Sequence, residues 1–224
     1  MREWIGQLPL FMRQLPVDKR GFPVPYFVAW QHGVPVFPAM DPKKFQIALK
    51  QKRCWVCGRK LFNNKAFVIG PMCCVNRINS EPPSHVECAE FSAKNCPFLS
   101  RPMAKRTFEG DRSQVAGIMI DRNPGVCAVW ITTTFKPFEA GNGTLFDLGP
   151  PKRLEFYAQG RIATDAEIRA SVASGLPLLM KASQEDGDWA VAEFLQAVER
   201  FDHMLQFFGR QPLNITRDEL EVAA

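Results

Sequence analysis

The chain has 224 residues, of which 46% are hydrophobic and 23% are charged, a composition typical of a soluble globular protein with one large domain or two small ones. No apolar run is long enough to predict a signal peptide or a membrane span, so we expect a cytoplasmic protein that does not enter a membrane. Six of the seven cysteines fall between residues 54 and 96, with Cys127 outside, and this odd, clustered set favours a reduced protein that holds a metal over a disulfide-bonded one.

The net charge of +5 is unevenly distributed along the chain. Residues 1–110 contain 17 Lys and Arg against 7 Asp and Glu, a net charge of +10, whereas residues 111–224 carry −5. We place a domain boundary in the basic linker near residue 110, which predicts two parts, 1–110 and 111–224. Phe and Trp are plentiful in both, so the sequence leaves open whether the parts share one core. The positive excess favours nucleic acid or another acidic partner, although lysines that only solvate a surface would give the same balance.

The first elements follow from turn and capping residues. Residues 1–23 predict an irregular arm, because Pro and Gly are scattered among apolar residues. Residues 25–30 and 34–37 are rich in β-forming residues around Gly33, which predicts a hairpin. Asp41 followed by Pro42 is a strong start signal for a helix that we expect to end near Lys52.

This helix and the residues after it carry a possible partner-binding strip. Lys43, Lys50 and Arg53 are spaced seven and three residues apart, so they fall close to one helical face. Trp55 follows, and such a strip beside an exposed aromatic ring would suit a phosphate backbone and its bases. The alternative, which we favour for Trp55 itself, is that its ring packs over a metal site and keeps water from it.

Four residues have the spacing of metal ligands. Cys54 and Cys57 form a C-x-x-C pair, and 27 residues separate Cys57 from His85, which forms an H-x-x-C pair with Cys88. Thiolate and imidazole are the usual ligands of tetrahedral Zn²⁺. Gly58 lets the backbone close tightly behind the first pair, because glycine tolerates positive φ. The sequence therefore predicts that these four residues bind one Zn²⁺.

A knuckle, a hairpin and a helix that supplies two ligands from its first turn resemble the treble-clef zinc finger, over about residues 52–98. The resemblance rests on ligand spacing, and it implies a closed site in which the ion stabilises a small module. Other cysteines lie nearby, and the spacing leaves open whether Cys73, Cys74 or Cys96 replaces one of the four ligands.

Between the two ligand pairs, residues 66–69 predict a strand, and an unusual segment follows it. Cys73 precedes a polar group of Asn76, Arg77 and Glu81, which together predict a possible pocket against the sheet. In that case the protein would be an enzyme or a small-ligand-binding protein, and Arg122 and Arg161 would be the nearest additional anion-binding residues. Cys73 would need a lowered thiol pKa to act as a nucleophile.

The second ligand pair falls at the start of a predicted helix. Ser84 is a good N-cap, and Glu87 at the third helical position would complete a capping box. We expect this helix to run from His85 to about Asn95, because the following Cys96-Pro97 pair disfavours helical backbone.

The rest of the chain predicts a sheet followed by helices, so that the fold class is α+β. Residues 115–121, 126–134, 144–148 and 153–157 predict four antiparallel strands. Thr164 and Glu167 form a capping box for a helix to about Ser174, and further helices are expected over residues 176–183 and 188–208. In the last of these the predicted buried stripe consists of Trp189, Ala192, Leu195, Val198 and Leu205. Residues after Pro212 are expected to be loosely held.

The chain has part of two enzyme patterns but lacks a required element of each. The His85-Val86-Glu87 sequence is similar to the H-x-E of zinc deaminases, but these enzymes also need P-C-x-x-C downstream, where this chain has only Cys96-Pro97. A nuclease of the HNH type needs a spare histidine as base, and the only histidines besides His85 are His32 and His203. We therefore favour a non-enzymatic binding module over an enzyme.

Overall fold

The computed structural model describes residues 6–101, 123–141 and 143–221, and it has the α+β fold that the sequence predicts. Its helices and strands are, in chain order, η1 (Leu10–Gln14), β1 (Val28–Gln31), β2 (Val34–Met40), α1 (Pro42–Gln51), β3 (Lys65–Ile69), α2 (Pro71–Asn76), β4 (Ile78–Asn79), α3 (Val86–Asn95), α4 (Pro97–Ser100), β5 (Cys127–Thr132), β6 (Phe135–Ala140), β7 (Gly143–Leu148), β8 (Arg153–Ala158), β9 (Arg161–Ile162), α5 (Asp165–Ala173), α6 (Leu176–Asp186), α7 (Asp188–Phe207) and α8 (Arg217–Glu221).

The N-terminal hairpin and helix form as predicted. β1 and β2 pair in antiparallel fashion around a turn in which His32 and Gly33 have φ values of 49° and 77°. The carboxylate of Asp41 accepts hydrogen bonds from the backbone N–H groups of Lys43 and Lys44, which caps α1. The helix ends one residue before Lys52, which takes the left-handed conformation.

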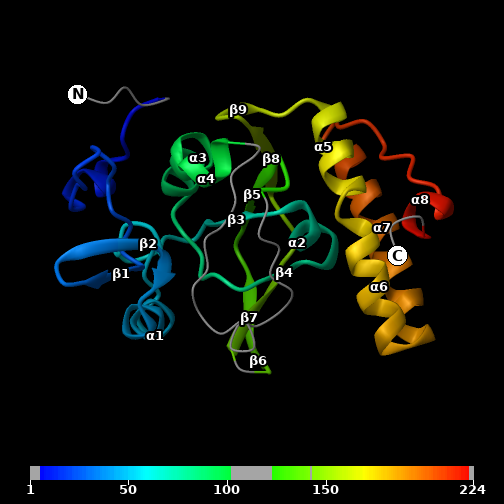
Figure 1. Cartoon of the computed structure of the whole chain (residues 1–224), viewed down its shortest axis with the longest axis horizontal. Coiled ribbons are helices and arrows are strands. Elements are labelled where there is room, and N and C mark those ends of the chain that lie inside the picture. Colours follow the sequence, from blue (N-terminus) through cyan, green and yellow to red (C-terminus); the bar gives the residue numbers. More distant parts are fainter. Residues whose placement is uncertain (1–5, 102–122, 142, 222–224) are drawn as a thin grey trace.

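A four-stranded antiparallel sheet in the order β3-β5-β8-β9 lies at the centre of the molecule (Figure 1). Its first strand, β3, precedes the proposed boundary near residue 110, and its neighbour β5 follows it, with Phe67 opposite Trp130. The sheet is therefore built from both halves of the chain.

Both faces of this sheet are covered, which explains why every residue of β5 is buried. Side chains alternate between the two faces of a strand. Cys127, Val129 and Ile131 pack with Ala89 and Ala93 of α3 on one face. The residues between them in β5, Ala128 and Trp130, belong to the main core on the other face.

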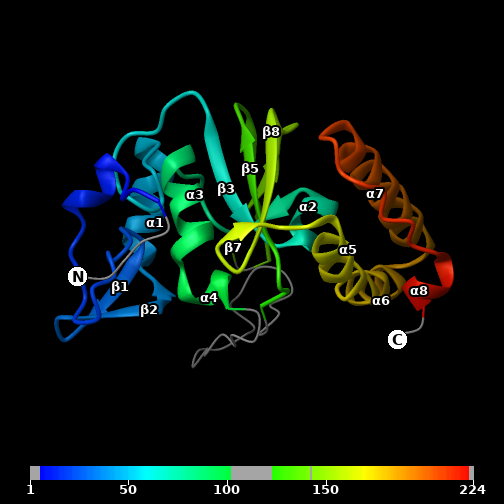
Figure 2. The same ribbon diagram turned by 90° about the horizontal axis from the view of Figure 1, so that it is seen from above.

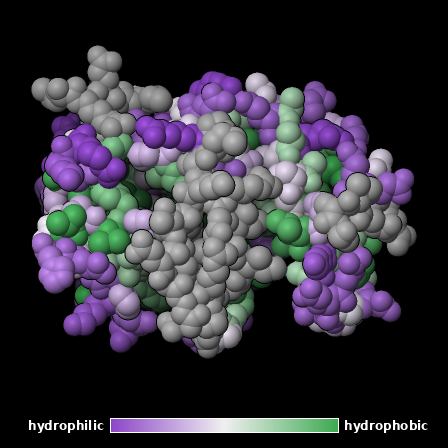
Figure 3. Space-filling model, in the orientation of Figure 1, coloured by the Kyte–Doolittle hydropathy of each residue, from purple (hydrophilic) through white to green (hydrophobic). Residues whose placement is uncertain are grey.

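The main core lies between the sheet and the C-terminal helices and extends to Phe45 of α1 and to Trp55. The molecule has three layers when viewed from above (Figure 2). The helix α3 with the N-terminal hairpin lies on one side, and α2 with α5, α6 and α7 lies on the other. Hydrophilic side chains cover much of the outer surface of this helical layer (Figure 3), as expected for helices that bury one face. Among the described residues, no helix combines the length and the apolar character that crossing a membrane would require.

A second, three-stranded sheet has the order β4-β7-β6. The sequence predicted β7 but not β6, which carries Pro137 and pairs along its whole length with β7. Among the described strands β6 lies at an edge of this sheet, where the missing N–H of a proline does little harm. The strand predicted over residues 115–121 and most of the basic linker lie outside the described residues.

The start of α3 differs from the prediction. Ser84 does not cap the helix, because its backbone N–H and C=O pair with Ala66 of β3 at 2.8 and 2.9 Å. The N-cap residue is His85, one position later, and no side chain in the described part of the chain caps this end. A pairing with a distant strand therefore shifted the helix start, and the predicted capping box with Glu87 does not form.

The C-terminal helices confirm their predicted starts but not the buried face of α7. The capping box of Thr164 and Glu167 is present at α5. The buried residues of α7 are Ala190, Phe194, Ala197, Phe201 and Leu205. The predicted stripe shares only Leu205 with this fully buried set, although Leu195 and Val198 are half-buried against the main core. Trp189 is 73% exposed.

The segment after Pro212 is also packed rather than loose. The Leu213 N–H donates to the carboxylate of Asp202 at 2.5 Å, and the side chains of Leu213 and Leu220 are buried in the main core. The Arg169 guanidinium donates to the Leu213 carbonyl and forms an ion pair with Glu219, which fixes this segment against α5.

Candidate metal centre

The structure brings together the four residues that the spacing selected. Their ligand atoms, the Sγ atoms of Cys54, Cys57 and Cys88 and a ring nitrogen of His85, all lie within 4.8 Å of one another, and all four residues are buried. Tetrahedral Zn²⁺ with bonds of about 2.0–2.3 Å holds its ligand atoms roughly 3.3–3.8 Å apart, so a small contraction would complete such a site. The cluster could hold one metal ion.

The first two ligands lie in a tight turn directly after α1. The Cys54 Sγ accepts hydrogen bonds from the backbone N–H groups of Cys57 at 3.4 Å and His85 at 3.3 Å. The turn is closed by the Gly58 N–H, which donates to the Cys54 carbonyl at 2.8 Å. Arg53 donates to the Gly58 carbonyl at 3.0 Å and holds the turn from outside. These backbone hydrogen bonds hold the Cys54 sulfur beside Cys57 and His85.

The histidine ring is oriented by a backbone carbonyl. Its Nε2 lies 2.9 Å from the Lys60 carbonyl, and its Nδ1 lies 3.3 Å from the Cys57 Sγ. Because a carbonyl only accepts, Nε2 carries the proton that it donates to Lys60. The Nδ1 lone pair is then directed at the three sulfurs, which is the support from outside the ligand set that ligating histidines usually have.

The protonation of the four residues is strongly coupled. Burial opposes ionisation of Cys54, but hydrogen bonds from Cys57, Cys88 and His85 outweigh it and hold its pKa well below the usual value. Hydrogen bonds to Cys54 and Cys57, together with burial, raise the pKa of Cys88. Burial lowers the pKa of His85, but its hydrogen bonds to Cys54 and Cys57 prevail and raise it to about 10. A divalent cation replaces these shared protons, so its binding releases protons.

The N-terminal arm covers the cluster. Met12 and Phe91 belong to the same small apolar cluster as the three cysteines, and Phe11 packs against its edge. The ring centroids of Phe11 and Phe62 lie 5.3 and 4.8 Å from that of His85. An apolar shell of this kind limits the access of water to a metal.

Trp55 does not supply this cover. Its ring belongs to the main core, where it stacks on Phe27 at 5.1 Å and meets the edge of Phe45 at 5.6 Å. It is 2% exposed, so its faces are not open to a nucleic-acid base. Its indole Nε1 has no hydrogen-bond partner among the described residues.

The predicted basic strip is reduced to two lysines. Lys43 and Lys50 are exposed on α1. Arg53 is half-buried and is held by Gln51 and the Gly58 carbonyl, so it supports the ligand turn.

The alternative ligands lie apart from the cluster. Cys73 and Cys74 are on α2 and Cys96 is the C-cap of α3, and none belongs to the metal-binding group found in the described parts of the chain. Burial raises the pKa of Cys73 to about 11, which keeps it as a thiol at neutral pH and opposes a role as nucleophile.

The other residues of the predicted pocket take part in hydrogen bonds that involve backbone groups. The Asn76 side chain accepts from the Ile78 N–H, and Arg77 donates through Nε and Nη2 to the Leu148 carbonyl. Glu81 is exposed, and its carbonyl accepts from Asn79. Of the two additional arginines, Arg161 is paired with Glu167 at 2.7 Å and Arg122 lies outside the described residues.

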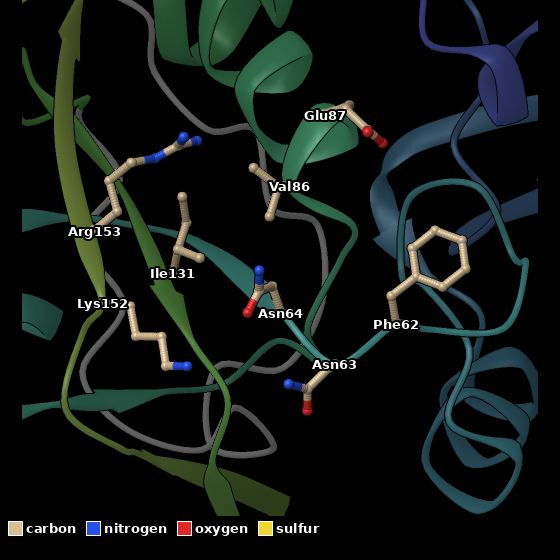
Figure 4. A pocket seen from close by; sticks show the side chains of 8 residues that line it. All are labelled: Phe62, Asn63, Asn64, Val86, Glu87, Ile131, Lys152 and Arg153. Atoms are coloured by element: carbon tan, nitrogen blue, oxygen red, sulfur yellow. The ribbon is translucent and has the colours of Figure 1, made fainter.

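A groove of about 520 Å³ lies elsewhere, beside the ligand turn and α3 (Figure 4). It is lined by Phe62, Asn63, Asn64, Val86, Glu87, Ile131, Lys152 and Arg153. The groove was not predicted, because Lys152 and Arg153 reach it only through the pairing of β3, β5 and β8. A polar pair after the ligand turn, Asn63-Asn64, is the only local signal that could have pointed to it.

The close approach of Gly58 to Tyr26 leads to a prediction. Gly58 has φ 72°, and a Cβ there would lie 2.7 Å from the Tyr26 Cδ2. Tyr26 cannot easily withdraw, because its N–H donates to the Val56 carbonyl at 2.7 Å. We expect Gly58→Ala to lower the free energy of unfolding by about 2–4 kcal/mol and to weaken metal affinity, since it combines left-handed strain with a clash.

The matched control is Gly33→Ala, because Gly33 has φ 77° but no atom within 4 Å of the added methyl group. In this variant only the left-handed strain should act, so the free energy of unfolding should fall by about 1–2 kcal/mol and metal affinity should not change. Chemical denaturation and a chelator competition would measure both quantities, and equal losses in the two variants would contradict the prediction.

Comparison with known proteins gives no match to a family model, to a curated protein or to a solved structure.

Proposed function

We propose that this chain is a zinc-binding protein in which the ion is structural, and that its N-terminal half binds nucleic acid or another acidic partner without catalysing a reaction. The observation that carries the proposal is the convergence of four buried ligands on one point. A site with four protein ligands leaves no position for a substrate or a reactive water, which is typical of structural zinc.

Zinc is the ion that this ligand set favours. Three thiolates and one imidazole are soft or borderline donors, and a tetrahedral set of this kind is typical of Zn²⁺. None of the seven cysteines is in a disulfide, which fits a reducing compartment such as the cytoplasm. Elemental analysis of the protein purified without added metal should find about one zinc per chain.

We also propose that residues 52–98 form a treble-clef-like module. The ligand turn at Cys54–Cys57 comes first, and Ala66 of β3 pairs in antiparallel fashion with Ser84. His85 and Cys88 then lie at the N-cap and in the first turn of α3. The inserted helix α2 and strand β4 lie between the two paired residues.

The charge distribution supports an acidic partner. Residues 1–110 carry +10, and Lys43 and Lys50 present exposed ammonium groups on α1. The alternative, an enzyme or small-ligand-binding protein with a pocket around Cys73, Asn76, Arg77 and Glu81, has less support. Asn76 and Arg77 are engaged with backbone groups, and the raised pKa of Cys73 makes it a poor nucleophile.

Binding of short oligonucleotides across a salt series tests the nucleic-acid partner. Lysine contacts with phosphates release counterions, so we expect affinity to fall steeply as salt increases. The double variant Lys43→Glu with Lys50→Glu should bind more weakly and should lower the salt slope by about two, because each phosphate contact contributes about 0.9.

The control is Lys136→Glu with Lys181→Glu, which makes the same charge change on exposed residues of β6 and α6. It should retain the affinity and slope of the unmodified protein to within the small long-range effect of net charge. Equal losses of affinity in the two double variants would show that binding depends on net charge and not on Lys43 and Lys50 in particular. Absence of binding at low salt would exclude nucleic acid as the partner.

A further inference from the structure

The groove beside the ligand turn is a second candidate binding surface, separate from the exposed lysines of α1. Its volume of about 520 Å³ is within the range of small-ligand sites. Val86 and Ile131 supply apolar surface between the start of α3 and the end of β5, and polar side chains surround it (Figure 4).

Phe62 offers an aromatic surface at one side of the groove. It is 60% exposed, although one side of its ring is held by His85 at 4.8 Å and by Phe11 at 6.0 Å between centroids. An aromatic ring that is exposed yet fixed by the metal centre is a suitable platform for stacking, because little side-chain entropy remains to be lost.

Two amides lie next to this platform. Asn63 and Asn64 are both exposed, and their side-chain amides make no hydrogen bond within the described part of the chain. The Asn63 carbonyl is held by the Lys65 ammonium at 2.8 Å, which also donates to Thr133, so the loop is anchored to the sheet. Amide side chains pair well with the hydrogen-bonding edges of bases.

The groove also contains a cation that is not neutralised. Arg153 forms ion pairs with Glu90 and Glu155. Lys152 has no ion pair or side-chain hydrogen bond among the described residues, while its backbone N–H is fixed by the Ile131 carbonyl at 2.7 Å. Among the described residues that line the groove, Glu87 is the one carboxylate, and its side chain points away from Lys152 (Figure 4). The part of the groove near Asn63 and Asn64 is therefore positive.

We propose that this groove binds an unpaired nucleotide of a single-stranded nucleic acid. The base stacks on Phe62, the amides of Asn63 and Asn64 bond to its edge, and the adjoining phosphate lies near Lys152. This inference rests on the proposed binding of nucleic acid and names the surface that distinguishes single strands from duplexes. A base within a duplex is already stacked on both faces, so it cannot use Phe62.

The test compares labelled single-stranded and duplex oligonucleotides of equal length, with zinc content measured for each variant. Phe62→Leu retains apolar packing on His85 but removes the aromatic face, and Lys152→Glu inverts the free charge. Each should weaken single-strand binding by about 5- to 100-fold, the range for one lost stack or phosphate contact, with little change for the duplex. Phe62→Trp keeps an aromatic face, so it should bind single strands as tightly as the unmodified protein or more tightly.

Matched controls are Phe207→Leu and Lys181→Glu, which change an 82% exposed phenylalanine of α7 and an exposed lysine of α6. One outcome is that single strands bind and that their affinity falls with Lys43→Glu and Lys50→Glu but not with the groove variants. In that case the groove proposal fails and the proposed function stands. If no oligonucleotide binds at low salt, both fail. A mononucleotide that binds as tightly as the oligonucleotide, with the same dependence on Phe62, would overturn the single-strand assignment in favour of a free nucleotide.

Discussion

Removal of the proposed zinc ion should unfold the module around α3 and lower the stability of the whole chain. The apolar cluster at the metal centre is small, with Met12, Val56 and Phe91 as its buried members besides the cysteines. Binding energy of a structural zinc, about 10–16 kcal/mol in isolated modules, then becomes folding energy. We expect Cys54→Ser to lose the zinc and to lower the melting temperature by well over 10 °C.

The effect should extend to the sheet. α3 packs on β5 through Ala89 and Ala93, and Ser84 pairs with β3. A chelator titration followed by circular dichroism and by zinc release would show both signals changing together.

The control variants are Cys73→Ala and Cys96→Ala, which change cysteines outside the four-residue group. Both should retain about one zinc per chain, whatever their effect on core packing. Loss of zinc in either variant would assign a different ligand set. A chelated or Cys54→Ser protein with an unchanged melting temperature would show that the ion is not structural.

Local sequence signals predicted the starts of α1 and α5 correctly. Asp41 caps α1 and Thr164 caps α5 because each side chain bonds to an N–H within three residues, so nothing remote is needed. The hairpin turn at Gly33 is likewise decided by the residue that tolerates positive φ.

Predictions failed where distant contacts compete with local ones. Ser84 has the right residue type for an N-cap, but its backbone is used by β3. In α7 two neighbouring faces are apolar, and the larger side chains of Phe194 and Phe201 occupy the core while Trp189 faces solvent. The strand β6 was not predicted, because Pro137 disfavours a strand inside a sheet and a sequence does not show which strand lies at an edge.

The four candidate metal ligands could be selected from the sequence because their spacing is that of a metal site, whereas their surroundings could not be predicted. Arg53 supports the ligand turn instead of facing a partner, and the arm rather than Trp55 covers the cluster. The groove combines Phe62 with Lys152, which are 90 residues apart in the sequence and meet only through the order of strands in the sheet.

Because Trp55 lies in the main core, we expect both halves of the chain to unfold as one unit. This core joins Phe45 and Trp55 from residues 1–110 with Trp130, Phe156 and Phe201 from residues 111–224. Trp130 is fully buried, and its Nε1 donates to the Gly149 carbonyl at 2.9 Å. We expect Trp130→Ala to lower the free energy of unfolding by about 3–5 kcal/mol.

Because Trp130 lies opposite Phe67 of β3, the loss should also ease zinc release from the other half. In a denaturant titration, circular dichroism and a zinc-release dye should give one coincident transition, shifted equally to lower denaturant by Trp130→Ala. Trp189→Ala is the matched control, since its ring is 73% exposed and its loss should change the midpoint little. Two separate transitions, with zinc release unaffected by Trp130→Ala, would instead establish two independent domains divided near residue 110.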